Sequence, residues 1–68
     1  MNPTTLYVGT REAVMAEVGT PGYYPGKYLT QPDGDAQWDA EGAATKAEVK
    51  AIIAQWRSVN PTIEVIWL

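Results

Sequence analysis

The stretch that decides the fold is Thr45 to Val59, TKAEVKAIIAQWRSV. It opens with a capping box, in which the Thr45 hydroxyl accepts the Glu48 N–H and the Glu48 carboxylate accepts the Thr45 N–H. Apolar residues then recur at the i, i+3, i+4, i+7 spacing of one helical face. They are Val49, Ile52, Ile53 and Trp56. The stretch predicts an amphipathic helix that ends at Asn60-Pro61, because the residue before a proline avoids the α region.

Two β-prone segments lie at the ends of the chain. Residues 4–8, TTLYV, are β-branched or aromatic and stand between Pro3 and Gly9, which predicts a strand. Residues 62–68, TIEVIWL, predict the last strand, with Ile63, Val65 and Trp67 on one face. Its other face carries Glu64, Ile66 and Leu68. Because only one polar group interrupts this strand, we expect both of its faces to be covered.

The middle of the chain is less regular. Residues 10–18, TREAVMAEV, allow a short helix capped by Thr10 and ended by Gly19, or a strand that follows a turn at Gly9-Thr10. We favour the helix. Residues 19–26, GTPGYYPG, contain two Pro-Gly turns and predict a loop. Residues 27–30 and 36–40 flank QPDGD, a tight reversal, and predict a β-hairpin.

These elements define an α+β fold with the order β-α-β-β-α-β, or β-β-β-β-α-β if residues 10–18 form a strand. We expect a single domain over residues 1–68, with a small single-layer antiparallel sheet and one main helix. The first order is the ferredoxin-like one, with its helices on one side of the sheet. A fold of this kind does not by itself indicate a function.

The composition excludes several functions. The 68 residues include no histidine and no cysteine, so the commonest general base and the commonest metal ligands are missing. The net charge of −3 makes direct binding of nucleic acid unfavourable, and no apolar run is long enough to span a membrane. We therefore predict a non-enzymatic protein without metal or cofactor, and we assign Lys46, Lys50 and Arg57 to the solvated face of the helix.

An acidic segment runs through the predicted hairpin. Its carboxylates are Asp33, Asp35, Asp39 and Glu41, with no lysine or arginine between Lys27 and Lys46. A strand over residues 35–41 places three of them in a stripe with a polar group about every 6.6 Å. This stripe is either a solvated sheet face or a surface that meets a basic groove on a partner. The segment does not match a calcium loop, because Trp38 stands at the position of the required glycine.

Two further features suggest contact with another protein. Tyr23, Tyr24 and Tyr28 lie in or beside the Pro-Gly loop, and tyrosine is enriched where proteins bind each other. The alternative is that one tyrosine of the pair packs onto the core. In the last strand, an exposed edge would pair with another chain to form a homodimer. The residues that carry this self-association are Ile63, Val65, Ile66 and Trp67. We favour a strand buried within its own sheet.

In outline the chain resembles the small anti-CRISPR inhibitors, which are short acidic α/β proteins of phages and mobile elements. The segments KYLTQPDGDAQWDA, TKAEVKAIIAQW and TIEVIWL carry this resemblance. It implies an inhibitor that acts in the cytoplasm of a bacterial host by covering a basic, nucleic-acid-binding surface of a host complex. The alternative is a self-assembling accessory subunit of a phage particle, paired through its C-terminal strand.

Overall fold

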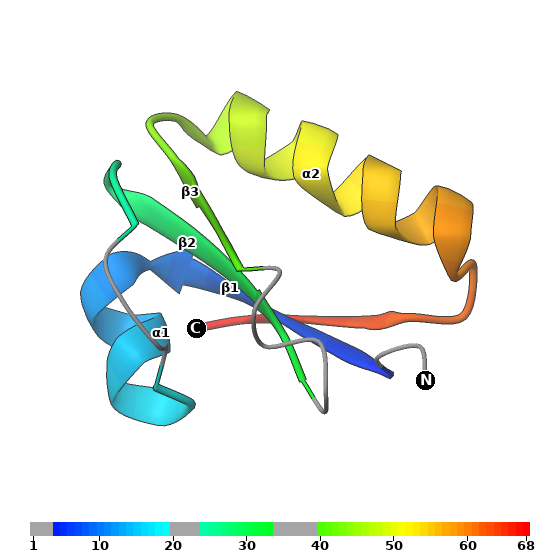
Figure 1. Ribbon diagram of the computed structural model, residues 1–68, viewed down its shortest axis with the longest axis horizontal. Coiled ribbons are helices and arrows are strands. Elements are labelled where there is room, and N and C mark those ends of the chain that lie inside the picture. Colours follow the sequence, from blue (N-terminus) through cyan, green and yellow to red (C-terminus); the bar gives the residue numbers. More distant parts are fainter. Residues whose placement is uncertain (1–3, 20–23, 34–39) are drawn as a thin grey trace.

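The computed structural model describes residues 4–19, 24–33 and 40–68 of the chain (Figure 1). The strands are β1 (Thr5–Thr10), β2 (Tyr28–Pro32), β3 (Glu41–Ala43) and β4 (Glu64–Trp67), and the helices are α1 (Arg11–Glu17) and α2 (Lys46–Val59). Along the chain they follow the predicted β-α-β-β-α-β order of an α+β fold. Within residues 10–18, Arg11–Glu17 therefore form the favoured short helix, while Thr10 is the last residue of β1.

The four strands form one sheet in the order β3-β2-β1-β4. β2 is antiparallel to both of its neighbours, with Val8 of β1 opposite Thr30 and Glu41 of β3 opposite Thr30 on the other side. β4 is parallel to β1, with Val8 opposite Trp67, so the sheet is mixed rather than wholly antiparallel. The reason is that α2 carries the chain back across the sheet, and a strand that follows such a crossover runs in the earlier direction.

The two helices cover opposite faces of the sheet (Figure 1). α2 packs through Val49 and Ile53 on Leu6 and Val8 of β1. On the other face, α1 packs through Val14 in a cluster with Leu29, Ala40 and the ring of Tyr7. Since neighbouring residues of a strand point to opposite faces, β1 has apolar side chains on both sides and needs a cover on each. The expected placement of both helices on one side is therefore wrong.

Both helices begin with a side-chain N-cap at the residue that the sequence predicts. Thr10 Oγ1 accepts the Ala13 N–H at the start of α1, and Thr45 Oγ1 accepts the Glu48 N–H at the start of α2, each at 3.3 Å. The return bond of the capping box differs from the prediction. Glu48 Oε2 accepts the N–H of Ala44 at 3.3 Å instead of that of Thr45.

The predicted hairpin is formed by β2 and β3, but its second strand begins later than expected. Ala40 lies outside β3 and is buried, and pairing with β2 starts at Glu41. In this register Tyr28, at the start of β2, is opposite Ala43 at the end of β3. Most of the strand predicted at 36–40 lies outside the described residues.

Candidate protein-binding site

The predicted acidic surface is described only at its two ends. Asp35 and Asp39 lie outside the described residues, and so does Tyr23 of the predicted tyrosine surface. Asp33 follows the last residue of β2, and Glu41 is the first residue of β3. Of the acidic segment, the structure therefore places only Asp33 and Glu41, which belong to the ends of two neighbouring strands of the sheet.

Asp33 is engaged within the fold. Its carboxylate accepts the backbone N–H groups of Thr4 at 3.1 Å and Thr5 at 3.2 Å, and the Thr4 hydroxyl at 3.4 Å. The Asp33 N–H in turn donates to the Thr5 carbonyl oxygen at 3.0 Å. These bonds fasten the beginning of β1 to the end of β2, so Asp33 acts as a clamp between two strands.

Glu41 is exposed and borders a shallow groove. The groove has a volume of about 380 Å³ and lies between the start of β3 and the last turns of α2. Its lining residues are Ala40, Glu41, Gln55, Trp56 and Val59. Of the two described acidic residues, Asp33 and Glu41, it is thus Glu41 that lies on an open surface.

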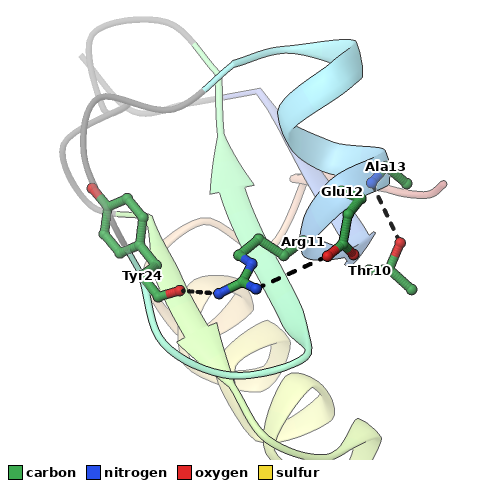
Figure 2. A network of polar contacts seen from close by, with 5 residues as sticks. All are labelled: Thr10, Arg11, Glu12, Ala13 and Tyr24. Atoms are coloured by element: carbon green, nitrogen blue, oxygen red, sulfur yellow. Dashed lines mark hydrogen bonds and ion pairs between the residues drawn. The ribbon is translucent and has the colours of Figure 1, made fainter.

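The two described tyrosines of the predicted surface contribute to different faces. Tyr24 is half-buried against the cluster under α1, whereas Tyr28 is half-buried against the cluster under α2. The carbonyl oxygen of Tyr24 accepts a hydrogen bond from Arg11 Nη1 at 3.3 Å, and Arg11 Nη2 lies 3.9 Å from Glu12 Oε1 (Figure 2). The structure therefore does not bring these two tyrosines together in one patch, and both take part in packing.

β4 lies at the edge of the sheet, outside β1. The interpretation that this strand is buried within its own sheet is therefore wrong. Of its residues, Val65 and Ile66 are half-buried and Trp67 is 49% exposed, while Ile63 just before the strand is buried. The expected cover on both faces is incomplete, because the backbone of α2 lies closest to β2 and β3 and the helix covers β4 only in part.

This offset of α2 opens a second groove, which we call the α2–β4 groove. It has a volume of about 710 Å³. α2 contributes Lys50, Ile53, Ala54, Arg57 and Ser58, and β4 contributes Val65 and Trp67. The floor is apolar and the helix side carries two cations. The helical periodicity predicts only that Lys50 and Arg57 lie on the solvated face of α2. Their place in one groove with Trp67 depends on where the helix crosses the sheet, which local sequence does not specify.

Comparison with known proteins finds no matching family model, no matching curated protein and no matching solved structure.

Within residues 4–19, 24–33 and 40–68, no group of three or more Asp and Glu side chains gathers in a way that could hold a metal ion. Over the same residues, neither helix has the length and apolar composition needed to cross a bilayer.

Proposed function

We propose that this protein is a non-enzymatic inhibitor that acts by covering a basic surface of another protein. The resemblance to anti-CRISPR inhibitors makes a nucleic-acid-handling complex in the cytoplasm of a bacterial host the class of partner. Asp35, Asp39 and Glu41 supply the charge that steers the two proteins together. Tyr23 and Tyr24 are the aromatic anchors of the proposal.

The observation that supports this proposal best is that the acidic segment is attached to the fold at both ends. Asp33 is held by hydrogen bonds to Thr4 and Thr5, and Ala40 is buried against Val14 and Leu29. A segment fixed at its two ends loses less conformational freedom on binding than a free tail does. Asp33, whose carboxylate accepts hydrogen bonds within the fold, is not needed for the proposed contact.

The experiment compares three tagged proteins in capture from bacterial lysate, followed by elution with a step of salt. They are the natural sequence, Asp35→Asn/Asp39→Asn, and the matched control Glu12→Gln/Glu17→Gln, which removes the same charge from α1. We expect one stoichiometric partner on the natural protein and on the control, released by salt because the contact is electrostatic. Equal capture by all three proteins at every salt concentration would contradict the proposal.

The edge position of β4 favours a second candidate function, self-assembly into a homodimer or a phage accessory structure through Ile63, Val65, Ile66 and Trp67. An edge strand has backbone groups that another copy can bond. Mass in solution, measured over a wide range of concentrations, tests this candidate. A dimer abolished by a charged residue at Ile66 supports it, and a monomer at all concentrations contradicts it.

A further inference from the structure

The backbone of β4 offers hydrogen-bonding groups at the edge of the sheet. Glu64 donates its N–H to the Thr4 carbonyl oxygen at 3.0 Å, and Leu68 donates its N–H to the Val8 carbonyl oxygen at 2.8 Å. Alternate residues of a parallel strand bond to the same neighbour. The N–H and C=O groups of Val65 and Trp67 therefore point away from β1, toward the side where the described part of the chain supplies no further strand.

The same two residues also line the α2–β4 groove with their side chains. Val65 is half-buried and Trp67 is 49% exposed, beside Ile53 and Ala54 of α2. A strand added at this edge would bond to Val65 and Trp67, and every second side chain of that strand would enter the groove. The edge and the groove thus form one surface for an extended segment.

The charges of the groove limit what that segment can be. Lys50 and Arg57 line the groove from the helix side, and among the described residues neither has a carboxylate within the 4.0 Å of an ion pair. They are seven positions apart on α2, which is about 10.5 Å along the helix axis. Two carboxylates on one face of a strand, four positions apart, lie about 13 Å apart. The spacing of the two cations is thus slightly shorter than the spacing of the two carboxylates, and the long flexible side chains of lysine and arginine make up this difference.

We propose that the α2–β4 groove binds an extended acidic segment of another protein, which adds to the sheet beside β4. The segment has the pattern Glu-x-Val-x-Glu, where either Asp or Glu serves as the acid and any apolar residue serves in the centre. The central side chain packs on Val65 and Trp67, and the two carboxylates contact Lys50 and Arg57. This site is separate from the acidic surface of the proposed function and uses partner chemistry of opposite sign.

Two other occupants fit the observations less well. A second copy paired through β4 brings Val65 and Trp67 into the groove but no carboxylate, since Glu64 lies on the other face of the strand. It also brings two more cations, Lys50 and Arg57 of that copy, to the same side of the joined sheet. Single-stranded nucleic acid could contact Lys50, Arg57 and Trp67 through its phosphates and bases. It has no peptide N–H and C=O groups to form hydrogen bonds with the backbone of β4.

The test uses a fluorescent peptide, Thr-Glu-Thr-Val-Thr-Glu-Thr with blocked ends, and the full-length protein. We expect saturable binding, with slowed hydrogen exchange at the Val65 and Trp67 amides and little change at those of Glu64 and Leu68, which already bond to β1. Binding should weaken by about tenfold in Lys50→Gln/Arg57→Gln, or when glutamine replaces both acids of the peptide. The matched control Lys27→Gln/Lys46→Gln, outside the groove, should change it by no more than about twofold.

Backbone pairing is tested separately by N-methylation of the peptide. Two versions are made, one for each set of alternate amides, and one of the two must lose binding because its methyl groups face β4. The proposal is overturned if the glutamine peptide binds as well as the acidic one, or if neither methylated version is weaker. Tighter binding of oligothymidylate, or protection of Val65 and Trp67 that rises with protein concentration in the absence of peptide, also overturns it. Asp35→Asn/Asp39→Asn should bind the peptide normally, so the two proposals fail independently.

Discussion

The carbonyl oxygen of Pro25 lies where the side chain of Gly42 would begin. A Cβ built on Gly42 would also meet the Pro25 carbonyl carbon at 3.0 Å and its nitrogen at 3.2 Å. All three atoms belong to the backbone, so they cannot turn away as the end of a flexible side chain can. The segment before β2 thus packs directly on β3, and this contact depends on glycine.

The first prediction concerns this contact. We expect Gly42→Ala to lower the free energy of unfolding by about 2 kcal/mol or more, because the backbone at Pro25 has to move. Gly19→Ala is the control: an added Cβ there has nothing within 4 Å, and the change only places alanine at a φ of +69°. That control should cost about 1 kcal/mol. Urea unfolding followed by tryptophan fluorescence measures both, and a smaller loss in Gly42→Ala than in the control would contradict the argument.

The second prediction concerns Thr30, which is fully buried in β2. Its Oγ1 has no hydrogen-bond partner among the described residues. Since burying an unbonded hydroxyl is unfavourable and valine has a similar volume, Thr30→Val should raise the free energy of unfolding by about 1 kcal/mol. Thr62→Val serves as the control, because the Thr62 hydroxyl is exposed and donates to Asn60 Oδ1 at 2.9 Å. A gain in stability in the control but not in Thr30→Val would show that the Thr30 hydroxyl is bonded.

The third prediction separates the two described carboxylates of the acidic segment. Asp33→Ala should lower the free energy of unfolding by about 1–3 kcal/mol, because Thr4 and Thr5 lose the acceptor of their N–H groups. Glu41→Ala, which alters an exposed residue, should change it by less than about 0.5 kcal/mol. Thermal unfolding of the two variants under the same conditions makes the comparison. Equal stability of the two would mean that Asp33 does not act as a clamp.

The fourth prediction concerns the start of α2. Thr45→Ala removes the acceptor of the Glu48 N–H and should cost about 1 kcal/mol of stability. Ser58→Ala is the control within the same helix, because the Ser58 hydroxyl only donates to the Gln55 carbonyl oxygen at 2.7 Å on the exposed side. Alanine is the best helix former, so this control should be neutral or slightly stabilising. Circular dichroism during urea unfolding follows the helices directly, and the prediction fails if both variants unfold at the same urea concentration.

The helices and most of the strands could be predicted because their signals are local. Thr45 and Glu48 lie within one turn at the start of α2, and Asn60-Pro61 lies directly at its end. The hairpin was predictable for the same reason, although its second strand begins at Glu41. Of the candidate sites, the self-association residues of β4 stay a prediction, made from a pattern that is also local. Sequence analysis did not identify Lys50 and Arg57 as partners of Trp67 in one groove.

The sequence by itself determined most of the helices and strands and the order in which they follow one another, because neighbouring residues decide capping, periodicity and turns. Only the tertiary structure decided that β4 lies beside β1 at an open edge and that α1 and α2 cover opposite faces of the sheet. It also decided that Asp33 bonds to Thr4 and Thr5, which lie 29 and 28 positions away. These features depend on contacts between residues far apart in the chain, and such contacts are selected by how whole faces pack together.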